Sequence, residues 1–165
     1  MNRIDTSIEI DAPPSAVWAV LRDFDSYPEW NPFVRVMGRP NVGAHLRVEL
    51  RPPGGRPTRF EPTVTAVERE REFRWQGHLL TRGIYDGEHV FRLEPLADGR
   101  TRFVHAESFS GLLVRPINRL FGSRFVQGFE SMNEALKTRV ESLVAAGELA
   151  AGDVDADPQD ADAAA

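Results

Sequence analysis

Apolar and polar residues alternate with a period of two along much of the chain between residues 3 and 110. The first run, residues 3–11, sets three isoleucines and a threonine against charged residues and a serine. Such alternation is typical of a strand with one buried and one solvated face, as in an antiparallel sheet. The same pattern predicts further strands at residues 33–37, 44–51, 59–67, 72–80, 83–96 and 101–110.

Helical periodicity replaces the alternation in three places. A short helix is expected from Pro14 or Ser15 to Leu21, and a second helical turn over residues 25–30, which Asn31-Pro32 ends. A long helix is expected over residues 116–146, where apolar residues recur every three or four positions. Gly122 and Gly128 weaken its first half by roughly 1 kcal/mol each relative to alanine, which predicts a bend there. The apolar stripe consists of Phe121, Phe125, Phe129, Met132, Leu136, Val140 and Leu143.

The order of these elements predicts an α+β fold. A bent antiparallel sheet of about seven strands, wrapped around the long C-terminal helix, would bury the apolar face of both. The two short helices would follow the first strand. Because the chain has 165 residues, 41% of them hydrophobic, it can form one domain with a sizeable core, which we assign to residues 1–146.

Charge divides the chain into two parts. Residues 147–165 contain six acidic and no basic residues, whereas residues 1–146 contain 19 acidic and 20 basic residues. The first part of the chain is therefore nearly neutral, and the second is an Ala/Asp-rich acidic tail that we expect to be disordered. Neither has the clustered basic face of a nucleic-acid-binding protein. The sequence shows no signal-peptide pattern and no cysteine, so a cytoplasmic location is expected.

The sequence contains five short motifs, which are IEIDAP followed by Val17-Trp18, YPEWNPF (27–33), WQG (75–77), GEHVF (87–91) and ESFSGLL (107–113). In this order they resemble the motifs of the START-like superfamily, also called SRPBCC. This superfamily includes the polyketide cyclase/dehydrase family, birch-pollen-allergen-like proteins and lipid-transfer domains. The resemblance extends from Ile4 to Leu143 and implies the helix-grip fold, with a cavity between the sheet and the long helix. It says less about activity, because the superfamily contains binding proteins, transfer proteins and enzymes.

A ligand cavity of this kind would be lined by inward-facing residues of the sheet and of the helix. Trp30 is an additional candidate at its mouth, although packing of the short helices onto the sheet is the interpretation we favour for it. The expected lining is Trp30, Phe73, Trp75, Tyr85, His89, Phe91, Phe103, His105, Glu107, Phe109, Phe121, Phe125 and Phe129.

His89, His105 and Glu107 are the candidates for polar chemistry, because the alternation places all three on the inward face of two consecutive strands. A buried glutamate needs a hydrogen-bond partner, which either histidine could supply. Three interpretations stay open. The residues form a polar network of the core, they anchor a ligand's hydroxyl or carbonyl group, or they act as a general acid and base.

Two histidines and a carboxylate also match a non-haem iron triad by residue type. However, the sequence contains no His-x-His or His-Glu-x-x-His spacing, and it lacks nucleotide-binding glycine motifs and a Gly-x-Ser-x-Gly motif. We therefore expect no metal and no cofactor.

Residues 112–121 mix leucines with Arg115 and Arg119. This segment could contact a membrane, although a lid loop leading into the helix is the interpretation we favour. The oligomeric state is not set by any pattern in the sequence.

The first hypothesis for function is a protein that binds or carries a small hydrophobic molecule such as a lipid, polyketide or aromatic compound. The second is a polyketide aromatase/cyclase or dehydratase that uses His89, His105 and Glu107 for proton transfer. The third, a protein-interaction module, would need an exposed apolar patch. The sequence shows no such patch, and the first hypothesis is preferred.

Overall fold

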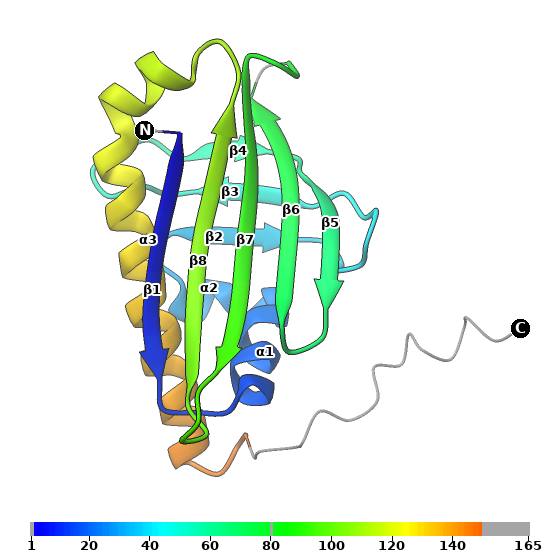
Figure 1. Ribbon diagram of the computed structural model, residues 1–165, viewed down its shortest axis with the longest axis vertical. Helices are drawn as coiled ribbons and strands as arrows, with labels where there is room; N and C mark the ends of the chain where they lie inside the picture. Colours follow the sequence, from blue (N-terminus) through cyan, green and yellow to red (C-terminus); the bar gives the residue numbers. More distant parts are fainter. Residues whose placement is uncertain (1, 80, 150–165) are drawn as a thin grey trace, which may run out of the picture.

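The computed structural model describes residues 2–79 and 81–149, and within them the chain folds into two antiparallel sheets and a long helix. The predicted acidic tail, residues 147–165, lies outside the described residues except for its first three positions. The larger sheet has the strand order β1-β8-β7-β6-β5, as Figure 1 shows. Its strands are β1 (Arg3–Ile10), β5 (Thr63–Glu68), β6 (Glu72–Leu79), β7 (Tyr85–Pro95) and β8 (Thr101–Ser110).

The smaller sheet lies behind the larger one and has the order β2-β3-β4. It comprises β2 (Val34–Met37), β3 (Arg47–Leu50) and β4 (Thr58–Phe60). Between β1 and β2 lie α1 (Pro14–Arg22), a 3₁₀ turn (Phe24–Ser26) and α2 (Tyr27–Trp30). The turn after α2 forms as predicted, because the side-chain oxygen of Asn31 accepts hydrogen bonds from the backbone N–H groups of Phe33 and Val34.

The predicted strand at residues 59–67 is two strands, β4 and β5, so the described residues contain eight strands rather than about seven. The break falls at Glu61-Pro62. Proline has no N–H group to donate to a ladder, and the carbonyl of Pro62 instead accepts a hydrogen bond from the N–H of Leu46. With the reciprocal bonds between residues 43–44 and Val64, this contact joins the two sheets at their shared corner.

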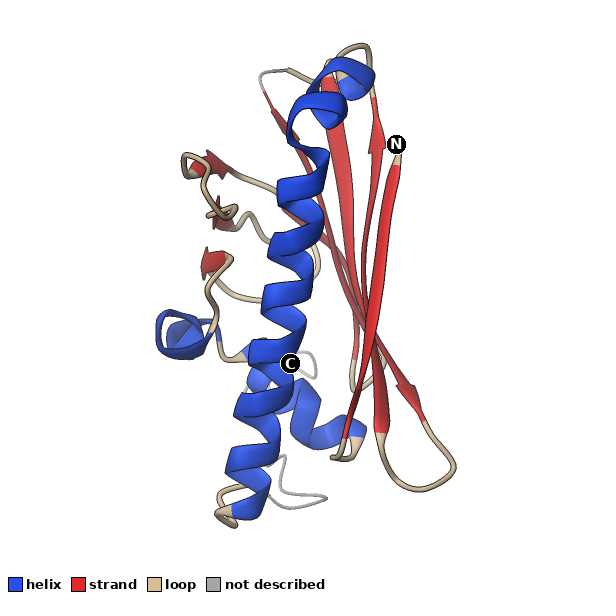
Figure 2. Cartoon of the chain, turned by 90° about the vertical axis from the view of Figure 1, so that its left-hand side faces the viewer, coloured by secondary structure: helices blue, strands red, loops and turns tan. Residues whose placement is uncertain are grey.

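Helix α3 (Val114–Ala145) lies along the β1 side of the large sheet, between the two sheets in the view of Figure 2. It begins two residues before the predicted start at Pro116, which is possible because N–H groups in a helix's first turn have no partner within the helix. Its first turns lean over the ends of β7 and β8 (Figures 1 and 2). The predicted wrapping of an antiparallel sheet around a long helix is thus confirmed.

The core lies between the large sheet, α3 and α1, and it is rich in aromatic side chains. Phe73 and Phe91 stack with their ring centroids 6.2 Å apart, and Trp75 contacts Phe91 edge-on. Gly128 of α3 lies directly against Phe33, since a Cβ atom at this glycine would come within 2.4 Å of the phenylalanine ring. The close approach of helix and ring therefore depends on the missing side chain.

Replacing Gly128 with alanine is expected to destabilise the protein by about 1–3 kcal/mol, because the added methyl group overlaps a buried ring. In an exposed helix the same change would stabilise by about 1 kcal/mol, so the sign of the effect is diagnostic. Urea denaturation measures it. Gln127→Ala, at the exposed neighbouring position, is the control, and a Gly128→Ala variant more stable than wild type would contradict the packing described.

Candidate functional site

A cavity of about 660 Å³ opens at the end of the molecule where α3 begins. Its walls come from the β3–β4 hairpin, the C-terminal end of β6, the start of β7, the end of β8 and the first half of α3. Its lining comprises Leu50, Pro52, Gly54, Gly55, Arg56, Thr58, Phe60, Gly77, His78, Leu79, Tyr85, Gly87, Glu107, Phe109, Ile117, Phe121, Arg124 and Phe125. This volume lies within the range of small-molecule sites.

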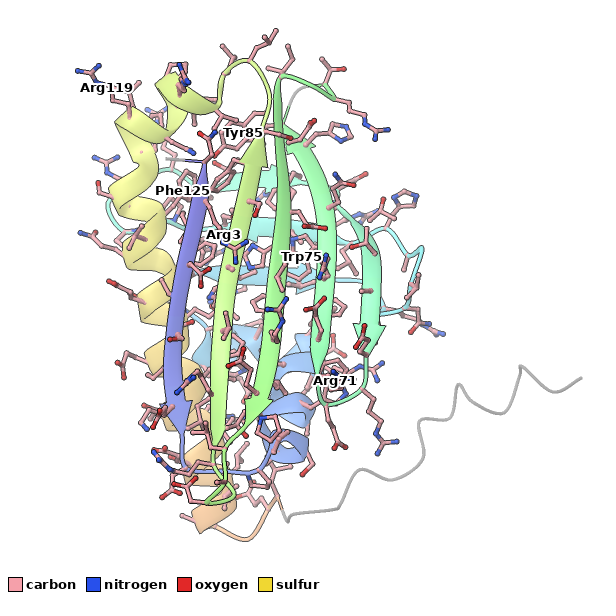
Figure 3. The ribbon with its side chains drawn as sticks, in the orientation of Figure 1. Arg3, Arg71, Trp75, Tyr85, Arg119 and Phe125 are labelled. Atoms are coloured by element: carbon pink, nitrogen blue, oxygen red, sulfur yellow. The ribbon has the colours of Figure 1, made fainter. Side chains whose placement is uncertain are left out.

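Five of the residues predicted to line a cavity do so. They are Tyr85, Glu107, Phe109, Phe121 and Phe125, of which Tyr85 and Phe125 are labelled in Figure 3. The other eight do not line this cavity, and they are Trp30, Phe73, Trp75, His89, Phe91, Phe103, His105 and Phe129. Trp30 packs edge-on against Tyr27, and the other seven are buried in the core. The inward face of the sheet is therefore divided, with packed rings toward α1 and open space toward the start of α3.

Several lining residues were missed by the sequence analysis. The Pro/Gly-rich segment from Pro52 to Pro57, between β3 and β4, supplies Pro52, Gly54, Gly55 and Arg56 to the lining. Gly77 and Gly87 also line the cavity, and the register places them opposite each other across β6 and β7. A Cβ atom at Gly77 would meet Phe60 at 2.9 Å, and one at Gly87 would meet the carboxyl oxygen Oε1 of Glu107 at 2.6 Å. The two glycines thus make room for Phe60 and for the Glu107 carboxyl group.

Glu107 stands at the deep end of the cavity and begins a chain of polar contacts that leads into the core. Its Oε2 lies 3.5 Å from Nδ1 of His89, and the Nε2 atoms of His89 and His105 are 2.7 Å apart. Nδ1 of His105 lies 2.9 Å from Oδ1 of Asn133 on α3. The structure therefore brings His89, His105 and Glu107 together, as predicted, and adds Asn133, which the sequence analysis did not single out.

The donor and acceptor of each hydrogen bond in this chain follow from its end at Thr6 and Asn133. The hydroxyl of Thr6 donates to the backbone carbonyl of His105, so it accepts from Nδ2 of Asn133. The amide oxygen of Asn133 therefore faces His105 and accepts a hydrogen bond from its Nδ1–H group. In a neutral His105, Nε2 is then the acceptor, and His89 donates to it through Nε2–H. This leaves Nδ1 of His89 as an acceptor that faces Glu107.

Burial keeps all three titratable groups uncharged at neutral pH. It lowers the pKa of His89 to about 3. Burial, together with the neighbouring His89, lowers the pKa of His105 well below its ordinary value. Burial also raises the pKa of Glu107 to about 8. A protonated Glu107 matches the unprotonated Nδ1 of His89, so hydrogen-bond geometry and desolvation indicate the same state. The deep end of the cavity thus presents a neutral carboxylic acid.

Tyr85 is the second buried polar group of the cavity lining. Its hydroxyl donates to Oδ1 of Asn118 on α3, at 2.8 Å, and ties the start of β7 to the helix. Burial raises the pKa of Tyr85, so its hydroxyl stays protonated. The mouth of the cavity differs in character, because Arg56, His78 and Arg124 there are exposed to solvent. The cavity therefore has basic side chains at its mouth and uncharged polar groups in its interior.

A metal site is not supported by the geometry of the triad. The two imidazoles turn their Nε2 atoms toward each other at hydrogen-bond distance, rather than toward a common point. Within residues 2–79 and 81–149, no group of three or more His, Asp or Glu side chains is arranged to hold a metal ion. In the same ranges, no helix is long and apolar enough to cross a bilayer.

Comparison with known proteins gives the same architecture. The solved structure of the ZhuI aromatase/cyclase from Streptomyces sp. R1128 is similar, with a TM-score of 0.70 and 18% identity over 88% of this chain and 97% of that one. A START superfamily protein from Mycobacterium smegmatis gives 0.63 and 22% identity, over 86% and 98% of the two chains. At these identities the likeness shows the fold alone.

Sequence comparison adds a curated relative and a family. The abscisic acid receptor PYL7 of Arabidopsis thaliana is 28% identical over 111 residues, which cover 61% of this chain. The matched part spans about half, 49%, of the receptor's length. The model of a family described as polyketide cyclase/dehydrase and lipid transport matches residues 1–141. This match covers nearly all of the two sheets and α3, and on that ground the chain belongs to the polyketide cyclase/dehydrase and lipid transport family.

Proposed function

We propose that this protein binds and carries a small, mostly apolar molecule in the cavity between α3 and strands β6, β7 and β8. The observation that supports this most directly is the cavity, which combines an apolar lining with one uncharged acid at its deep end. Phe109, Phe125 and Ile117 provide apolar surface, while Glu107 and Tyr85 are the polar groups inside. Ligand-binding pockets are typically apolar, with a small number of polar groups that point into them and orient the ligand.

The state of Glu107 restricts the part of the ligand that reaches it. A protonated carboxyl group has one proton to donate, and the acceptor Nδ1 of His89 takes it, so toward the cavity Glu107 can only accept a hydrogen bond. It therefore favours a hydroxyl group of the ligand over a carboxylate. The pocket also offers no cation at this depth, since Arg56 and Arg124 lie at the mouth. A lipid, polyketide or aromatic compound with an uncharged oxygen at one end fits this environment.

Identification of the bound molecule tests the proposal. The protein is purified from its own host, extracted with organic solvent, and the extract is analysed by mass spectrometry. A stoichiometric hydrophobic compound bearing a neutral oxygen function is the expected result. If folded protein yields no such compound, and also fails to bind an apolar fluorophore such as Nile red, the proposal is wrong.

A second function, that of an aromatase/cyclase or dehydratase, is favoured by one observation, the acid at the deep end of the cavity. Glu107 could protonate a departing hydroxyl group or a developing enolate oxygen. Both reactions also require a base that removes a proton from carbon. Among the described lining residues, the remaining candidate is His78, which lies exposed at the mouth. The carrier function therefore stands first.

Glu107→Gln separates the two functions. The glutamine amide can still donate to Nδ1 of His89, so the hydrogen-bond chain is preserved while the transferable proton is lost. In an enzyme that uses this acid, turnover of a polyketide substrate should fall by 10²-fold or more. In a carrier, the variant should change ligand affinity alone.

A further inference from the structure

The segment from Gly111 to Arg124 and Arg82, which together we call the rim, carries most of the exposed large apolar side chains of the described residues. Four of the six lie between positions 112 and 121, and Leu112 and Leu120 are the most exposed of them, at 81% and 71%. The other two in this segment are Leu113 and Phe121. The sequence analysis found no exposed apolar patch, and the structure corrects this, because it leaves these four side chains open to solvent.

Four arginines surround the exposed leucines. Arg115, Arg119 and Arg124 belong to α3, and Arg82 lies in the β6–β7 loop. Backbone hydrogen bonds from Leu112 to Gly83 and from Leu113 to Ile84 hold that loop against the start of the helix. Figure 3 shows Arg119 pointing away from the body of the protein.

None of these four arginines has an ion-pair partner among the described residues. Many of the other arginines have acidic partners, as in the cluster that Arg74 and Arg92 form with Glu72 on the outer face of the large sheet. The sequence has no acidic residue between Gly111 and Phe129. Asp86, the acidic side chain nearest to the β6–β7 loop in sequence, accepts hydrogen bonds from the N–H group of Gly83. The rim is therefore both apolar and positively charged.

The rim is continuous with the cavity. Phe121 and Arg124 belong to both, since each lines the cavity and is exposed to solvent. A hydrophobic molecule that enters here need not cross bulk water if the rim rests on a hydrophobic phase. Leucines that insert among acyl chains and arginines that contact lipid phosphates are the features of an interfacial membrane contact.

We propose that residues 111–124, with Arg82, dock on an anionic lipid bilayer, and that the cavity exchanges its ligand with that bilayer. This inference rests on the proposed carrier function and names the source of its ligand. A second copy of this chain fits the rim poorly, because a symmetric contact would bring unpaired arginines against one another. The charge complementarity of an anionic bilayer favours it as the occupant.

Vesicle sedimentation of the full chain tests the docking. Vesicles of phosphatidylcholine with 30% phosphatidylserine are compared with vesicles of phosphatidylcholine alone. Wild type should sediment with the anionic vesicles and lose this binding as salt is added. The double change Arg115→Gln and Arg119→Gln should weaken it about 30-fold. Leu112→Ser with Leu120→Ser should also weaken it by at least tenfold.

Arg47→Gln with Arg71→Gln is the matched control, because it removes two exposed arginines away from the rim. It should leave vesicle binding within twofold of wild type. Equal loss in this control, or no binding of wild type to anionic vesicles, overturns the docking. If the chain instead self-associates through Leu112 and Leu120 without binding vesicles, the patch serves a protein partner and the proposal is wrong.

Titration with Nile red in the absence of vesicles separates this failure from failure of the carrier function. The rim variants should keep the affinity of wild type for the dye. A wild type that binds the dye but not anionic vesicles would overturn the docking alone, whereas a wild type that binds neither would overturn both.

Discussion

Glu107 should lower the stability of wild type as the pH rises from 5 to 8, and replacing it with glutamine should abolish this decrease. The pKa of Glu107 is raised to about 8 by burial, against 4.5 for the free side chain. Between these values the folded state holds a proton that the unfolded state has released, so the free energy of unfolding falls with increasing pH. Through Glu107, each pH unit lowers the free energy of unfolding by about 1.4 kcal/mol, and the whole interval from pH 5 to 8 lowers it by about 4 kcal/mol.

The measurement is the free energy of unfolding in urea at several pH values, for wild type and Glu107→Gln. The two buried histidines act in the opposite direction. Their lowered pKa values make the folded state lose stability as the pH falls below about 6.5. Because both proteins retain His89 and His105, this contribution cancels in the difference between the two curves. The stability of the variant relative to wild type should therefore rise from pH 5 to pH 8.

Glu130→Gln removes an exposed carboxyl group from α3 and serves as the control for the loss of one acidic residue. Its difference from wild type should stay nearly constant over the same range. A Glu107→Gln difference that is equally constant would mean that Glu107 is already ionised at pH 5 in the folded protein. The neutral deep end, and the preference for an uncharged ligand oxygen, would then be wrong.

Filling the cavity should abolish ligand binding without unfolding the protein. Thr58 lies on β4, lines the cavity and is partly exposed, so a tryptophan there can project into the open space rather than into packed core. Thr58→Trp is expected to weaken binding of Nile red by at least tenfold, because the indole ring occupies part of the roughly 660 Å³ that a ligand needs. Fluorescence titration measures the affinity, and circular dichroism checks the fold.

Thr65→Trp is the matched control, since Thr65 is exposed on β5 and does not line the cavity. It should bind the dye as wild type does. If Thr58→Trp is folded and binds with unchanged affinity, the ligand occupies another part of the molecule, and the site assigned to β6, β7, β8 and α3 is incorrect.

The alternation of residue types was sufficient to predict the main architecture. A strand with a period of two has one set of residues to bury, so the inward position of His89, His105 and Glu107 followed from the sequence alone. The stripe on the long helix determined which face meets the sheet in the same way. Local chemistry also set the turn at Asn31-Pro32, because asparagine bonds to its own following backbone.

The sequence could not show which inward residues pack and which face open space, because this depends on what the opposite element contributes. Phe129 stacks on His105, with ring centroids 3.9 Å apart, and closes one half of the interior. Gly77 and Gly87 face each other only because of the β6–β7 register. The β3–β4 hairpin forms a wall of the cavity because Pro62 separates β4 from β5. These are contacts between residues far apart in the chain.

The protonation state of Glu107 at the deep end of the cavity was likewise decided by tertiary structure. Thr6, Asn133 and His105 come from β1, α3 and β8, and their contacts orient each hydrogen bond as far as Glu107. The exposure of the leucines in the rim could not be predicted either, since it depends on which elements pack against the start of α3. The sequence determined the inward and outward faces through local periodicity, whereas the cavity, its neutral acid and its basic, apolar rim required the packing of distant segments.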